Sequence, residues 1–207
     1  MVTREPQFEI GAFHTIGRTK YIVESVNAHK ATLRALKSGK IKVVDLSDSK
    51  SVKINAGKTL LSLDPSTSSC GWAIFKNGTL YKSGQIHPRA SLSVQKRICF
   101  VSDRLDRLID DNGVTEVMSE DIYYGGLVDV YESLAMLKGV IYYICNSKKI
   151  KIEYVLPSIW KSYFKIARRD TKEGKRLAIE LCRKKTGKKY PEDESEAILV
   201  GMYKLRK

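Results

Sequence analysis

Four acidic residues lie where separate predicted elements of the sequence end or begin. Asp64 follows the apolar run 59–63, and Glu120 closes a second apolar run. Asp193 and Glu196 open the last predicted helix, and their three-residue spacing places them on one face of it. Because ligand sites of α/β sheets lie at strand ends, a mixed sheet can bring these carboxylates together.

Carboxylates without histidine or cysteine partners indicate a particular chemistry. Oxygen-only ligation suits Mg²⁺, and Mn²⁺ can substitute for it. Two such ions about 4 Å apart can activate a water and stabilise the leaving oxygen in phosphodiester hydrolysis. Each acid also has a structural alternative, because helix first turns favour acidic residues and aspartates form turns. The combination favours a metal-dependent hydrolytic site over four unrelated acids.

The region 58–207 alternates strand and helix patterns. Buried or alternating apolar runs predict five strands, and the Asn77–Gly78 pair predicts a hairpin between the second and third. The helical spacing of Ile98, Val101, Leu105 and Leu108 predicts a helix that ends near residue 113. We therefore predict an α/β fold with a mixed five-stranded sheet flanked by helices. The predicted strands are 59–63, 71–75, 79–86, 116–121 and 150–155, and the other predicted helices are 127–147, 172–186 and 193–205.

The region 1–57 has a different pattern. Short alternating runs separated by turn residues predict a small antiparallel β-barrel of SH3-like size, with a linker at 56–58. The predicted strands are 20–26, 31–36, 41–46 and 52–54. The sequence leaves open whether this domain binds DNA or protein.

Composition limits the function classes. The 207-residue chain carries a net charge of +14: residues 148–189 carry +11, residues 1–57 carry +5, and the remaining residues together carry −2. A basic excess gathered in two segments favours a polyanionic partner. No run is apolar enough for a membrane span, and no signal or transit peptide is evident, which predicts a cytoplasmic protein with no membrane partner. Four scattered cysteines argue against a disulfide framework or a structural zinc site.

The segment Leu63–Gly71 also resembles the first phosphate loop of actin-like and sugar-kinase ATPases. Those proteins need two related domains and a second phosphate loop, and the roughly 150 residues after the linker are too few for both. The ATPase interpretation is therefore rejected.

Residues 59–206 resemble the RuvC family of Holliday-junction resolvases within the ribonuclease-H-like superfamily. Intervals of 56 and 73 residues separate Asp64, Glu120 and Asp193, and both are similar to the family's. The order of the short motifs carries the resemblance together with their spacing. These motifs are Leu60–Ile74, Ser119–Tyr124, Glu132–Gly139, Tyr154–Lys161 with the basic stretch to Lys172, and Asp193–Ala197.

The resemblance implies a homodimeric, Mg²⁺-dependent endonuclease that nicks two opposed strands of a four-way DNA junction and leaves a 5′-phosphate and a 3′-hydroxyl. Asp64, Glu120, Asp193 and Glu196 would be the catalytic metal ligands, with two ions in each active site. A cytoplasmic bacterial or viral setting follows from the same resemblance. Glu196 departs from the family, which usually has Asp or His there.

The resemblance also implies DNA contacts. Tyr123 would stack on unpaired bases near the crossover, and Lys161 and Lys172 would contact phosphates. Arg168 and Arg169 belong to the same basic stretch, although the loop lacks the family's glycines. A structural alternative for Tyr123 is a core or interface tyrosine. The apolar helix 127–147 is either a buried core helix or a dimer interface, which two equivalent cut sites would suit.

Two other functions remain open. The first is a related nuclease that prefers flaps, forks, other branched DNA or RNA–DNA hybrids. The second is a non-catalytic DNA-binding protein built on a nuclease scaffold.

Overall fold

The computed structural model describes residues 13–16, 19–26, 30–45, 55–56, 58–168 and 170–206. The chain divides into two compact units, Met1–Lys58 and Thr59–Lys207. Within the described residues, no helix is both long enough and apolar enough to cross a membrane.

The first unit contains an antiparallel sheet with strand order β4-β3-β2-β1-β5. Alternate side chains of β3 are fully buried because one face of the sheet carries the apolar residues. Strands β2 to β4 match the predicted runs, β1 was not predicted, and the predicted strand 52–54 lies outside the described residues. Closure into an SH3-like barrel stays a prediction. The strands are β1 (Phe13–Ile16), β2 (Thr19–Val26), β3 (Lys30–Ala35), β4 (Ile41–Asp45) and β5 (Asn55–Ala56).

The second unit contains a mixed five-stranded sheet with order β10-β9-β6-β7-β8. Strands β6, β9 and β10 run parallel, whereas β7 is antiparallel to β6 and β8 is antiparallel to β7. This confirms the predicted mixed sheet. The strands are β6 (Thr59–Asp64), β7 (Cys70–Lys76), β8 (Thr79–Ile86), β9 (Glu116–Glu120) and β10 (Lys151–Val155).

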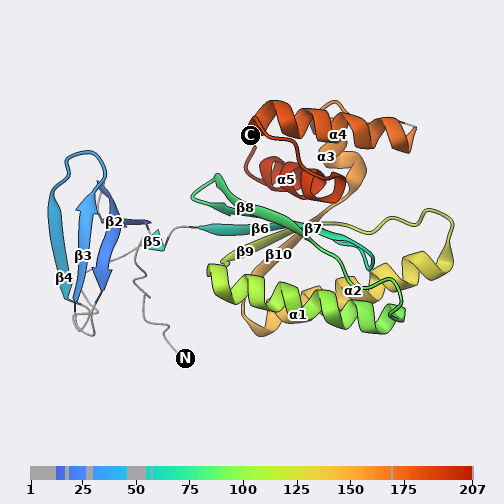
Figure 1. Ribbon diagram of the computed structural model, residues 1–207, viewed down its shortest axis with the longest axis horizontal. Helices are drawn as coiled ribbons and strands as arrows, with labels where there is room; N and C mark the ends of the chain where they lie inside the picture. The colour runs from blue at the N-terminus through green and yellow to red at the C-terminus, as the bar shows by residue number, and fades with distance from the viewer. Residues whose placement is uncertain are drawn as a thin grey trace. The chain divides into compact units, whose positions relative to one another are not determined.

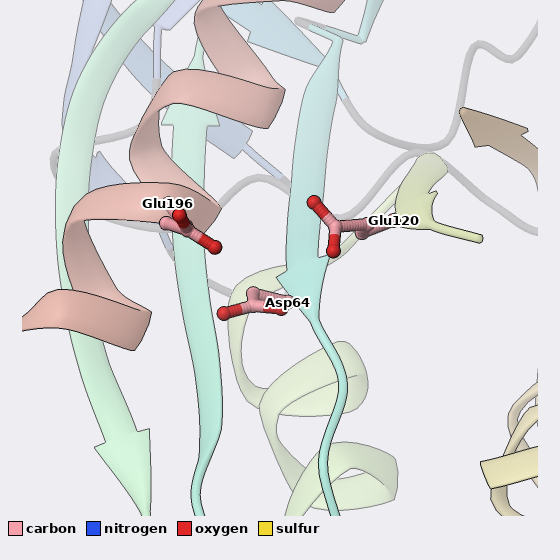
Figure 2. A group of neighbouring side chains, drawn as sticks. All are labelled: Asp64, Glu120 and Glu196. Carbon is pink, nitrogen blue, oxygen red and sulfur yellow. The ribbon is translucent and has the colours of Figure 1, made fainter. Parts of the chain in front are cut away.

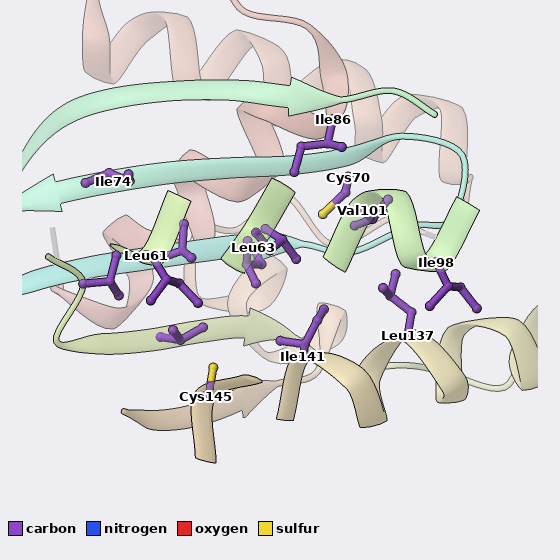
Figure 3. Close-up of a cluster of buried hydrophobic side chains, with 14 residues drawn as sticks. Leu61, Leu63, Cys70, Ile74, Ile86, Ile98, Val101, Leu137, Ile141 and Cys145 are labelled. Carbon is purple, nitrogen blue, oxygen red and sulfur yellow. The ribbon is translucent and has the colours of Figure 1, made fainter. Parts of the chain in front are cut away.

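Helices cover both faces of this sheet (Figure 1). α1 (Val94–Asn112) and α2 (Val128–Ser147) cover one face, and their side chains pack on Leu61, Leu63 and Ile74, as Figure 3 shows. On the other face, α5 (Glu192–Lys204) packs on β6 and β7, and α3 (Pro157–Tyr163) and α4 (Thr171–Thr186) pack on α5 in the same buried cluster. Successive strand side chains point to opposite faces, so one strand supplies both cores.

Local signals explain several boundaries. Ser93 caps α1 by accepting a hydrogen bond from the Lys96 N–H, and Gly113 ends it in the left-handed conformation at φ 60°. Asn77 and Gly78 have φ values of 52° and 76°, which the tight β7–β8 turn requires. The short helix α3 was not predicted, because its seven residues show too little periodicity to be recognised.

Candidate active site

Two of the predicted acids lie at the same edge of the sheet. Strands β6 and β9 are parallel neighbours in which Leu63 pairs with Ser119. The next residues, Asp64 and Glu120, are therefore brought together at the carboxyl ends of the two strands.

The third acid reaches them from α5. Glu196 is 6% exposed, and α5 crosses the sheet face close to β6, where the Ser62 hydroxyl donates to the Ala197 carbonyl at 2.7 Å. Figure 2 shows the carboxylates of Asp64, Glu120 and Glu196 gathered around a common space. One oxygen from each lies within 4.8 Å of the others. We call these three residues the carboxylate cluster.

Helix α3 supplies one hydrogen-bond donor and one cation to the cluster. The fully buried Trp160 donates its indole Nε1–H to Glu120 Oε2 at 2.5 Å. The ammonium of Lys161, predicted to contact phosphate, lies 2.8 Å from Glu196 Oε1. Pro157 opens this helix, where its fixed φ and missing N–H cause no loss of hydrogen bonding.

Burial and mutual repulsion disfavour charge in the cluster. Desolvation, followed by the negative charges of Glu120 and Glu196, holds the pKa of Asp64 well above its usual range. Desolvation and the charge of Glu196 also raise the pKa of Glu120 to about 7, even though Lys161 and the Trp160 hydrogen bond oppose this rise. A cation bound here would therefore reduce the repulsion between these carboxylates and favour their ionised forms.

The cluster fits a hard divalent cation. The negative charge of three carboxylates, once ionised, would exceed the single positive charge of Lys161, and all the candidate ligands are oxygen atoms. Glu196 Oε1 is buried and accepts no hydrogen bond from the described residues, because the nearby Lys161 ammonium is close enough for an ion pair but poorly directed. Asp64, Glu120 and Glu196 would hold such an ion.

Asp193, the fourth predicted ligand, lies outside the carboxylate cluster. Its Oδ2 accepts hydrogen bonds from the Ser69 hydroxyl and from Gln85 Nε2, the latter at 3.0 Å. Its negative charge nevertheless contributes to the raised pKa of Asp64, so Asp193 belongs to the same electrostatic site. The structure thus brings three of the four predicted acids into one cluster. The fourth, Asp193, is instead held by hydrogen bonds from Ser69 and Gln85.

The predicted DNA-contacting residues are in varied settings. Tyr123 lies in the segment after β9 and is 72% exposed, which excludes the core alternative. Arg168 is exposed and lies 3.6 Å from the Glu173 carboxylate, and Lys172 is exposed in the first turn of α4. Arg169 lies outside the described residues.

Sequence reasoning missed Trp160, Ser69 and Gln85 as contributors to the site. Trp160 lies within the quoted motif Tyr154–Lys161, so its adjacency to Lys161 was an available signal. Ser69 and Gln85 had no comparable signal, because their partner Asp193 is more than 100 residues away in sequence.

Comparisons with known proteins agree with this geometry. The family model described as crossover junction endodeoxyribonuclease RuvC matches residues 60–203. The structure of Thermus thermophilus RuvC in complex with Holliday junction substrate has 10% sequence identity and a TM-score of 0.56, over 72% of this chain and 96% of that chain. A fowlpox virus resolvase complexed with substrate Holliday junction DNA has 11% identity and a TM-score of 0.53, over 72% and 97%. A search of curated proteins finds no match. At these identities the two structures establish a shared fold.

Proposed function

The chain belongs to the RuvC family of crossover junction endodeoxyribonucleases, and from this premise we propose that it nicks four-way DNA junctions symmetrically. The observation that carries the proposal is the carboxylate cluster, in which three elements contribute acids to one space within 4.8 Å. A scaffold retained only for DNA binding would have no need of such repulsive, desolvated carboxylates.

The proposed mechanism assigns a task to each residue of the site. Asp64, Glu120 and Glu196 would hold divalent ions, with Asp193 as a further ligand, and we propose Mg²⁺ with two ions per site. When bound, these ions lower the pKa of water and stabilise the charge that develops on the phosphate. Trp160 orients Glu120 through its indole N–H, and Lys161 holds Glu196 and offers positive charge to the scissile phosphate.

We assign DNA binding to exposed residues of the second unit. Tyr123 presents its ring to solvent just beyond Glu120, which supports stacking on an unpaired base at the crossover. Lys172 and Arg168 are exposed cations that suit phosphate contacts, and Arg169 is proposed from the sequence alone. Phosphate contacts of this kind make binding strongly dependent on salt.

We further propose a homodimer assembled through α2. One side of this helix buries Leu137, Ile141 and Cys145, so the helix is anchored in the core. Other α2 side chains leave a large apolar surface in solvent, which is unusual for a monomer. The exposed apolar residues are Val128, Val130, Tyr131, Met136, Tyr142 and Tyr143. Two copies related by a two-fold axis would present two active sites to the two opposed strands.

Labelled four-way, flap, linear and RNA–DNA hybrid substrates test the proposal when they are incubated with the protein and Mg²⁺, with Asp64→Asn as the matched inactive variant. We expect paired symmetric nicks in the four-way junction and at least about a 1,000-fold lower rate for Asp64→Asn. Binding of these substrates without cleavage would reject the proposal that the protein is a nuclease. Cleavage confined to flaps or hybrids would reject the resolvase, and equal cleavage by Asp64→Asn would reject this active site.

A further inference from the structure

Asp193 is oriented by the sheet rather than by its own helix. The Ser69 hydroxyl, just before β7, and the Gln85 amide, in β8, both donate to Asp193 Oδ2. Gln85 Nε2 also lies 3.4 Å from Ser69 Oγ, so the two donors form one connected group with the carboxylate. A first-turn acid that only stabilised the helix dipole would not require partners from two separate segments of the chain.

The orientation of the Gln85 amide follows from its two neighbours. Asp193 Oδ2 can only accept hydrogen bonds, so the amide nitrogen of Gln85 must face it. The amide oxygen then faces His87 Nε2 at 3.1 Å, and that nitrogen must carry the hydrogen. The Asp193 carboxylate thereby sets the orientation of the amide, and His87 complements that orientation through its Nε2–H.

Close backbone packing places this group beside the carboxylate cluster. Gly71 pairs with Asp64 across β6 and β7, and a Cβ at Gly71 would lie only 2.0 Å from the Asp193 carbonyl oxygen. The start of α5 therefore rests directly on the backbone opposite Asp64. Both hydrogen bonds go to Oδ2 of Asp193, which leaves Oδ1 the less engaged oxygen for a cation.

We propose that Gln85, together with Ser69, is a positioning residue that orients Asp193 for binding a divalent cation beside Asp64. This inference deepens the proposed function and rests on it. Fixing a ligand before the ion arrives reduces the entropy lost on binding, and loss of such supporting hydrogen bonds typically weakens metal affinity 10- to 100-fold. A purely structural tether between β8 and α5 would instead affect only folding stability.

The test is a double-mutant cycle read by Mn²⁺ affinity in calorimetric titrations of the full chain without DNA. Gln85→Leu keeps the side-chain size but removes the hydrogen bonds to Asp193, Ser69 and His87, and we expect about a 10-fold weaker Kd for Mn²⁺. In an Asp193→Asn background the same change should alter the Kd less than about twofold, because the anionic ligand that Gln85 orients has been removed. Ser69→Ala should behave like Gln85→Leu, and Ser69→Thr, which keeps the hydroxyl, should retain most of the affinity.

The exposed Gln95 on α1 provides the matched control, and Gln95→Leu should leave the Kd unchanged. Thermal melts without metal should show the Gln85→Leu variant folded. An unchanged Kd for Gln85→Leu, or an equal loss in both backgrounds, would overturn the inference. These readouts do not depend on cleavage, so junction cleavage with an unchanged Gln85→Leu affinity would reject the positioning role alone. Mn²⁺ affinities as expected, without junction cleavage, would reject the proposed function alone.

Discussion

Two glutamates on neighbouring strands experience opposite electrostatic environments. Glu120, at the end of β9, is desolvated beside Glu196, and its pKa rises to about 7. Glu153, in β10, accepts hydrogen bonds from Lys151 and Lys204 at 2.6 and 2.7 Å, and its pKa falls to about 2. The same side chain is thus costly to ionise in one place and easily ionised in the other.

This difference separates a functional carboxylate from a structural one. Glu153 has enough cationic partners within the chain, so folding alone satisfies its charge. Glu120 has one indole N–H and shares one ammonium with two other acids, so its charge remains incompletely balanced. Buried repulsion of this kind persists where a ligand compensates for it.

The largest expected effect distinguishes the two glutamates by cleavage. Glu120→Gln removes a proposed ion ligand, and we expect at least about a 100-fold lower rate of junction cleavage in Mg²⁺. Glu153→Gln is the matched control and should cleave at the wild-type rate. Similar losses in both variants would show that the electrostatic contrast does not identify the active site.

A smaller effect should follow from Trp160→Phe, which deletes the indole N–H but keeps an aromatic ring. Without this donor, which favours the charged form, the pKa of Glu120 should rise above about 7. We expect cleavage about 10-fold slower at neutral pH and a rate profile displaced to higher pH. Trp72→Phe changes the other tryptophan, and a similar displacement there would contradict the role of the Trp160 hydrogen bond.

The sequence predicted the residues that lie at element ends and failed for those that act across the fold. Asp64 and Glu120 follow apolar strands, and parallel neighbours bring such positions together without further information. The Trp160–Glu120 hydrogen bond spans 40 residues, and the Gln85–Asp193 bond spans 108. Such pairs depend on strand order and on where α3 and α5 cross the sheet, which local patterns do not encode.

The same reasoning explains the outcome for α2. Its apolar residues predicted either a core helix or an interface, and the structure gives it a buried side through Leu137 and Ile141 while Tyr142 and Tyr143 stay exposed. Periodicity gave the helix and its buried stripe. It could not assign a role to the remaining apolar surface, because the pattern of one chain does not encode intermolecular contacts.

A third effect concerns stability without metal. Because the pKa of Glu120 is higher in the folded state than its usual 4.5, folding stability should fall as pH rises from about 4.5 through about 7. Thermal melts in chelator should therefore show that the Glu120→Gln variant becomes more stable relative to the wild type as pH rises across this range. The expected difference in the free energy of unfolding is on the order of 1–3 kcal/mol. Added Mg²⁺ should reverse the order above about pH 7, since the ion binds the ionised cluster. A wild-type protein that becomes more stable than the variant with rising pH in chelator would contradict the burial argument.

The smallest effect belongs to Glu153 and has the opposite sign. Its pKa lies below the usual 4.5, so its ion pairs stabilise the fold above about pH 4.5 and lose this contribution as pH falls toward about 2. Since these pairs are partly exposed and screened by solvent, Glu153→Gln should cost at most about 1 kcal/mol at neutral pH. Denaturant unfolding at neutral and acidic pH measures this cost and its expected disappearance. If Glu153→Gln stabilised the protein, Lys151 and Lys204 would not compensate for the charge of the Glu153 carboxylate. The difference between Glu153 and Glu120 would then come from their burial alone.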